Sequence, residues 1–123
     1  EEAKPRGDFR TRRHMVFFWA TWCGPCKSSV PELLAWSRWS GVPVVAVSDE
    51  DEPTLQRFLG NWTSPFPEIV ASDALRRSHV TYGVSGTPTF VLVDEKGKIV
   101  WRQVGYSPKE RLTIPGWKWT GAE

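Results

Sequence analysis

Two cysteines three residues apart are the side chains of this chain best suited to covalent chemistry. Cys23 and Cys26 are the only cysteines among its 123 residues, and they lie in Trp22-Cys23-Gly24-Pro25-Cys26. A bond between them stabilises the fold little, because chain-entropy stabilisation grows with the length of the closed loop. The spacing therefore favours redox exchange or half of a metal site.

The sequence offers few further ligands for a metal. A closed structural zinc site needs four ligands. Besides the two cysteines, only His14 and His79 could complete such a site, and neither has paired spacing. We therefore expect no metal and no other cofactor, and we interpret the cysteines as a dithiol–disulfide couple.

The elements on either side of the cysteines would place them where a thiolate is favoured. Residues 15–20 form a continuous apolar run, typical of a strand buried on both faces. Residues 25–38 predict a helix with a kink at Pro31. Cys23 then lies at a helix N-terminus, so its pKa should fall below that of free cysteine. Cys26, one turn later on the same face, can resolve a mixed disulfide.

The rest of the chain predicts an α/β sandwich on a mixed central sheet, in the order β-α-β-α-α-β-β-α. Helical crossover makes the first two strands parallel, and a short turn at 94–97 makes the last two antiparallel. We expect one domain over residues 1–123, with a lead-in tail at 1–13 and a C-terminal tail at 115–123. The remaining predicted elements are strand 42–47, helices 53–60 and 74–82, strands 87–94 and 98–104, and a last short helix after the capping box Ser107-Pro108-Lys109-Glu110.

Composition sets bounds on the partners. The net charge is only +2, and the basic cluster at residues 4–14 is not followed by a pattern of residues that would contact nucleic-acid bases. We therefore expect no nucleic-acid partner. That cluster suits a solvated or membrane-proximal end. No apolar run reaches the length of about 18 residues that a membrane span needs. Eight tryptophans supply either core or a binding surface.

Two separated motifs resemble the thioredoxin superfamily over about residues 15–112. The first is Phe18-Trp19-Ala20-Thr21-Trp22-Cys23-Gly24-Pro25-Cys26-Lys27, followed by Pro31, and the second is Tyr82-Gly83-Val84-Ser85-Gly86-Thr87-Pro88-Thr89. The resemblance implies a thioredoxin fold, with Pro88 as a cis-proline facing the cysteines. The extra segment 49–78, an insert before the cis-proline motif, is similar to that of the TlpA/ResA branch of extracytoplasmic reductases.

The resemblance also implies a site and its partners. Cys23 would attack a disulfide of a partner protein, Cys26 would resolve it, and a thiol electron donor would restore the pair; both encounters would be transient. We expect a monomer that is located outside the cytoplasm, with a cytoplasmic location as the open alternative. A membrane anchor outside residues 1–123 would be compatible with the first location. A shallow groove for the substrate chain would be lined by Trp22, Gly24, Pro25, Thr87 and Pro88.

Three positions depart from the relatives and leave the general base open. Phe17 stands where plain thioredoxins have a buried Asp, Ser29 where the ResA type has a Glu, and Thr89 where the CcmG type has a Glu. The candidate bases are Glu32, Asp49, Glu50 and Glu68.

Three functions therefore remain open. The first is a thiol–disulfide oxidoreductase, which reduces protein disulfides. The second is a binding module for cysteine-bearing segments with little turnover, although the presence of both cysteines counts against it. The third is a peroxide-reducing enzyme like the peroxiredoxins, for which the Cys-x-x-Cys pair is a poorer fit than for disulfide exchange.

Overall fold

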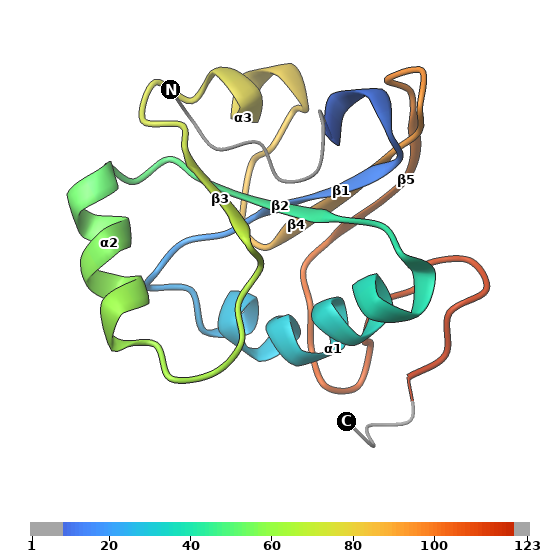
Figure 1. Cartoon of the computed structure of the whole chain (residues 1–123), viewed down its shortest axis with the longest axis horizontal. Helices are drawn as coiled ribbons and strands as arrows, with labels where there is room; N and C mark the ends of the chain where they lie inside the picture. The colour runs from blue at the N-terminus through green and yellow to red at the C-terminus, as the bar shows by residue number, and fades with distance from the viewer. Residues whose placement is uncertain (1–8, 120–123) are drawn as a thin grey trace.

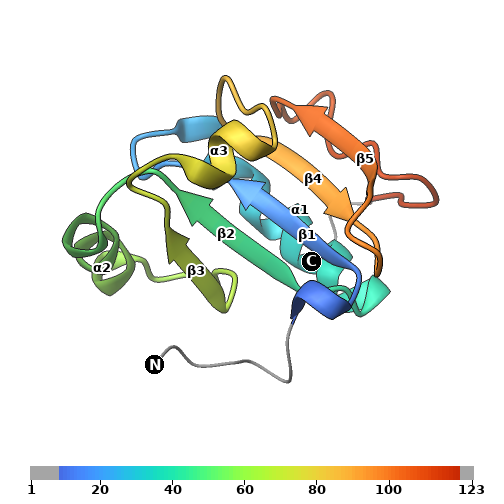
Figure 2. The ribbon, with the colours of Figure 1, turned by 90° about the horizontal axis from the view of Figure 1, so that it is seen from above.

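The computed structural model describes residues 9–119, which form a mixed sheet with helices on both faces (Figure 1, Figure 2). The elements are the 3-10 helix η1 (Phe9–Thr11), β1 (His14–Phe18), α1 (Gly24–Ser40), β2 (Val44–Ser48), α2 (Glu52–Asn61), β3 (Ile69–Ser72), α3 (Arg77–Thr81), β4 (Thr89–Val93) and β5 (Ile99–Val104).

The five strands run in the order β3-β2-β1-β4-β5. β1, β2 and β3 are parallel, β4 is antiparallel to β1, and β5 is antiparallel to β4. The predicted mixed sheet, its parallel first pair and its antiparallel last pair are confirmed. β1 lies at the centre with all five residues buried, as its continuous apolar run predicts.

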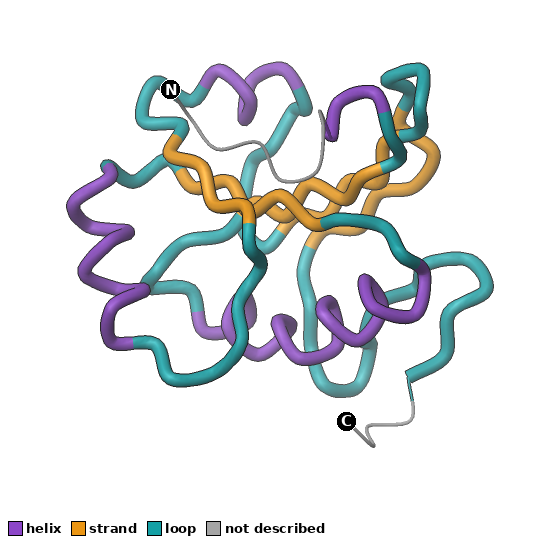
Figure 3. The backbone as a smooth tube through the Cα atoms, viewed as in Figure 1, coloured by secondary structure: helices purple, strands orange, loops and turns teal. Residues whose placement is uncertain are grey.

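The core has two layers because successive side chains of a strand point to opposite faces. Met15 and Phe17 of β1 pack with α1 and with Leu55 of α2 on one face. Val16 and Phe18 pack on the other face, in the cluster beneath α3 and η1. Figure 3 shows the strands as a layer between α1 and α3. The residues that precede the cysteine motif are thus held from both sides.

α1 presents the cysteines at its N-terminal end. Gly41 ends the helix in the left-handed conformation (φ 76°), and its N–H donates to the carbonyl of Ser37 at 2.8 Å; glycine adopts this conformation without steric cost. Pro31 lies inside the helix, as predicted, and the helix still continues to Ser40. Its buried face, which includes Leu33 and Trp36, packs against the sheet.

Two sequence-based expectations about the elements were wrong or incomplete. The segment 49–78 is not only an insert of loop and helix, because it also supplies β3, which extends the sheet beside β2. β3 has only four residues, all half-buried at the sheet edge. So short a segment shows no clear alternation of apolar and polar residues.

The predicted last helix does not form. The capping contact at its start is present, since the Glu110 N–H donates to Ser107 Oγ at 3.1 Å. Arg111 then adopts a left-handed backbone (φ 57°), and residues 111–119 continue as turns and irregular chain. The local start signal is outweighed by tertiary contacts of this segment, which are described below.

Candidate active site

The cysteine turn connects the end of β1 to the start of α1. Cys23 is the N-cap residue, with extended backbone, and its N–H donates to the Ala20 carbonyl at 3.1 Å. Its Sγ accepts from the Cys26 N–H at 3.2 Å. The sulfur therefore takes the place that a capping oxygen usually occupies, next to the unpaired amides of the first helical turn.

The structure holds the cysteine pair in its oxidised form. Cys23 and Cys26 are joined by a disulfide with their Cα atoms 5.2 Å apart. Cys26 is fully buried, whereas Cys23 retains 3% of its surface exposed. Only Cys23 thus has a surface, however small, that an incoming sulfur can reach.

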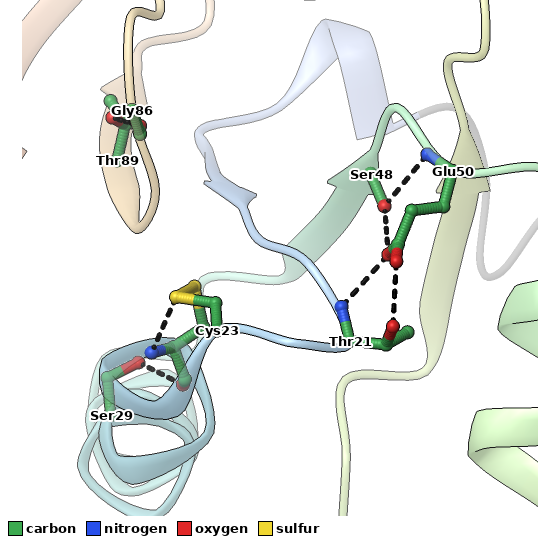
Figure 4. The surroundings of a disulfide bond; sticks show 8 residues. Thr21, Cys23, Ser29, Ser48, Glu50, Gly86 and Thr89 are labelled. Carbon is green, nitrogen blue, oxygen red and sulfur yellow. Dashed lines mark hydrogen bonds between the residues drawn. A yellow bond between two sulfur atoms is a disulfide. The ribbon is translucent and has the colours of Figure 1, made fainter.

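The second motif lies at the same end of the central strands as the cysteine turn. Phe18, the last residue of β1, pairs with Thr89, the first residue of β4. The peptide bond between Thr87 and Pro88 is cis. Two hydrogen bonds define the turn around it: Thr89 Oγ1 donates to the Gly86 carbonyl at 2.7 Å, and the Gly105 N–H donates to the Pro88 carbonyl at 2.8 Å. Figure 4 shows Gly86 and Thr89 above Cys23.

The predicted groove residues differ in exposure. Trp22 is 75% exposed, in contrast to Trp19 and Trp36, which belong to the core. Gly24 and Pro25 are exposed and Thr87 is half-buried. Pro88 is fully buried. The hydroxyl of Thr87 is buried and has no hydrogen-bond partner among residues 9–119.

Asp73 holds the helix that leads into the cis-proline turn. It accepts from the N–H groups of Arg77, Ser78 and His79 at 2.9–3.2 Å, and His79 Nδ1 lies 2.8 Å from the same carboxylate. Burial raises the pKa of Asp73, but the hydrogen bonds from His79 and its neighbours outweigh burial and hold that pKa below its usual value. α3 begins only at Arg77, with Arg76 as its N-cap residue, so Asp73 binds the first turn of the helix from outside the N-cap position.

Glu32, one of the candidate bases, serves a different set of donors. Its carboxylate accepts from Tyr106 Oη at 2.7 Å, from the Leu112 N–H at 3.3 Å and from Trp117 Nε1 at 2.8 Å. Burial, together with the hydrogen bond to Glu32, raises the pKa of Tyr106. Glu32 is 1% exposed, and it ties the C-terminal segment to α1.

The other three candidate bases lie in different surroundings. Arg76 donates to Asp49, and Glu68 lines a cavity of about 480 Å³ at the opposite end of the sheet. Glu50 accepts from the backbone and hydroxyl of Thr21. The sequence pattern named Glu50 but missed Thr21, because nothing local links residues so far apart in the chain.

Two further observations concern a metal site and a membrane span. Within residues 9–119 no group of three or more His, Cys, Asp or Glu side chains is arranged to hold a metal ion. His14 and His79 contact the Arg12 carbonyl and Asp73 respectively. In the same described region, no helix is both long and apolar enough to cross a membrane.

Known proteins share both the sequence and the fold. A thiol-disulfide oxidoreductase ResA of Bacillus anthracis is 34% identical over 109 residues, 85% of this chain and 62% of the relative. The thiol:disulfide interchange protein HelX of Rhodobacter capsulatus is 32% identical over 100 residues, 80% of this chain and 56% of the relative. The chain therefore spans about three fifths of the length of these relatives.

Solved structures agree with this relationship. A crystal structure from Chlorobium tepidum, bearing the name thiol:disulfide interchange protein DsbE, is 34% identical with a TM-score of 0.69 and covers 83% of this chain and 74% of its own. The thioredoxin domain of a thiol-disulfide oxidoreductase from Bacteroides vulgatus is 26% identical with a TM-score of 0.64, over 81% of this chain and 75% of its own. The expected thioredoxin fold is confirmed. The Redoxin family model matches residues 4–117, and the chain therefore belongs to the Redoxin family.

Proposed function

We propose that the chain is a thiol–disulfide oxidoreductase that reduces protein disulfides through Cys23 and Cys26. The observation that carries the proposal is the disulfide at the N-terminal end of α1, with Cys23 as the N-cap. The names of the ResA and HelX relatives support the same activity. A helix N-terminus favours the thiolate, which is the nucleophile in disulfide exchange.

The reaction would proceed in two exchanges. The Cys23 thiolate attacks one sulfur of the partner disulfide, forming a mixed disulfide and releasing the other sulfur as a thiolate. The Cys26 thiolate then attacks Cys23 Sγ and releases the second partner thiolate. Two electrons pass from the cysteine pair to the partner, and the protons on its new thiols come from the pair through solvent. A donor dithiol reduces the Cys23–Cys26 disulfide in turn.

Substrate binding would use a small contact around Cys23. Trp22 offers an apolar ring, Gly24 and Pro25 add little bulk, and the Thr87 backbone can bond an extended chain. One or two such hydrogen bonds contribute about 1 kcal/mol each. Binding is then weak and transient, which suits an electron-transfer encounter with several partners.

The test is insulin reduction with dithiothreitol as donor, with peroxide consumption measured in parallel. We expect insulin reduction to require both cysteines and peroxide consumption to stay at the uncatalysed rate. Cys26→Ser should trap mixed disulfides on Cys23, and Cys23→Ser should trap none. Trapping without turnover in the unaltered protein would favour a binding module, and peroxide turnover alone would favour a peroxidase.

We also propose that the domain acts as a monomer outside the cytoplasm. Support for the extracytoplasmic location comes from the resemblance of the 49–78 segment to the insert of the extracytoplasmic branch. A membrane anchor outside residues 1–123 would be consistent with that location. Light scattering during gel filtration tests the monomer. Fractionation of cells that express the natural gene tests the compartment and the anchor.

A further inference from the structure

The carboxylate of Glu50 makes three hydrogen bonds beside the cysteine turn. Its Oε1 accepts from the Thr21 N–H at 2.9 Å and from Ser48 Oγ at 2.7 Å, and its Oε2 accepts from Thr21 Oγ1 at 2.7 Å. Figure 4 shows Glu50 and Thr21 facing each other, with Cys23 further along the same loop. Both donors of Thr21 are thus satisfied by one side chain.

Glu50 is itself fixed to the sheet. Its N–H donates to Ser48 Oγ at 3.1 Å, at the end of β2, and its carbonyl accepts from Ser72 Oγ at 2.6 Å, at the end of β3. Ser48 is fully buried. The Glu50 carboxylate therefore projects from a support that two paired strands hold in place.

Thr21 lies two residues before Cys23, in the loop whose conformation positions the Cys23 sulfur. The loop begins after β1 and closes where the Cys23 N–H donates to the Ala20 carbonyl. The Glu50–Thr21 contact lies inside this closed turn and joins it to the sheet from the side. A change at Thr21 would move the neighbouring Trp22 and the capping sulfur of Cys23 together.

We propose that Glu50 is a positioning residue for the redox reaction, which it serves by holding Thr21 and, through it, the Cys23 turn. The inference rests on the proposed function for its catalytic consequence. Disulfide exchange needs an aligned attack by the sulfur, so misplacement of the turn slows the reaction. The same misplacement weakens the contact between Cys23 Sγ and the first helical turn, which favours the thiolate.

Two substitutions of Glu50 separate positioning from charge. A glutamine at this position could accept from the Thr21 N–H and Ser48 Oγ with its oxygen and donate to Thr21 Oγ1 with its amide, so Glu50→Gln retains the contacts without the charge. Glu50→Ala loses both. Glu52→Ala is the matched control, because it removes an exposed carboxylate only two residues from Glu50.

The first readout is the rate of insulin reduction. Glu50→Ala should lower kcat/KM about tenfold, while Glu50→Gln and Glu52→Ala should stay within about threefold of the unaltered protein. Thr21→Ala should also lower the rate. Combined with Glu50→Ala, it should add little, because both substitutions break the same link. Additive losses from the two substitutions would overturn the proposal.

The second readout is alkylation of Cys23 by iodoacetamide as a function of pH, in a Cys26→Ser background so that only one thiol reacts. Positioning predicts that Glu50→Ala moves the midpoint to higher pH and that Glu50→Gln leaves it in place. A role for charge alone predicts the opposite sign, with both substitutions moving the midpoint to lower pH. An unmoved midpoint in both variants, with only a loss of stability, would also overturn the proposal.

The alkylation experiment does not depend on enzymatic activity. If the unaltered protein neither reduces insulin nor forms mixed disulfides, the proposed function fails. The alkylation midpoints still decide whether Glu50 positions Cys23. Urea unfolding of each oxidised variant shows whether a lost rate reflects the folded protein.

Discussion

Replacement of the buried carboxylate of Glu32 should cost a large part of the stability of this domain. Glu32→Ala leaves three donors without their acceptor, and two of them, Tyr106 Oη and Trp117 Nε1, now lie within 2.8 Å of it. Hydrogen bonds to charged groups contribute about 1.5–3 kcal/mol each. Because both rings are half-buried and can regain some water, we expect the lower part of that range, a loss of about 3–4 kcal/mol in the free energy of unfolding.

Glu32→Gln should cost less, about 1–2 kcal/mol, since its oxygen can still accept from Trp117 while its amide donates to Tyr106 Oη. Urea unfolding of the oxidised protein, followed by circular dichroism, measures both losses. Glu110→Ala is the matched control, because Glu110 is an exposed carboxylate of the same C-terminal segment, and it should change stability by less than about 0.5 kcal/mol. A loss below about 1 kcal/mol for Glu32→Ala, at an unchanged urea dependence, would refute this reasoning.

Two further predictions concern the groove and the helix before the cis-proline turn. Trp22→Ala should lower kcat/KM about fivefold for a protein disulfide and less than twofold for a small disulfide such as oxidised glutathione, because only a chain reaches the exposed ring; an equal effect on both would place substrate choice elsewhere. Asp73→Asn should reduce the free energy of unfolding by about 1–2 kcal/mol at pH 7. Because the folded pKa of Asp73 is lowered, its contribution is present above the unfolded pKa and lost as pH falls through the folded one, so Asp73→Asn should weaken the acid dependence below about pH 4. Urea unfolding at a series of pH values measures this dependence. If the free energy of unfolding fell with acid as steeply in Asp73→Asn as in the unaltered protein, the attribution to Asp73 would be contradicted.

Local sequence determined the elements whose signals are short-range. The apolar run before the cysteines predicts β1, and Pro53 predicts the first turn of α2, where the structure adds Asp51 as the N-cap that accepts from the Thr54 N–H. The hairpin turn at 94–97 closes with the Gly97 N–H on the Asp94 carbonyl. Such features depend on a few neighbouring residues, so one sequence is enough to predict them.

The cysteine motif behaves in the same way. Cys23 becomes the N-cap because a buried strand ends shortly before it and Pro25 suits the first helical turn. The prediction that Cys23 leads the helix and Cys26 lies inside it followed from this local context together with the spacing of the cysteines. The assignment of attacking and resolving roles stays a prediction for the cysteine variants to test.

Tertiary structure decided what the carboxylates do and where the chain ends its regular structure. Glu50 meets Thr21 across 29 positions of the chain, and Glu32 meets Tyr106 across 74 and Trp117 across 85. Those contacts arise from the pairing of β2 with β1 and from the path of residues 106–117 over α1. This segment does not form the helix that the capping box at Ser107 predicts. Its buried tertiary contacts stabilise the irregular chain by more than its weak local preference stabilises a helix.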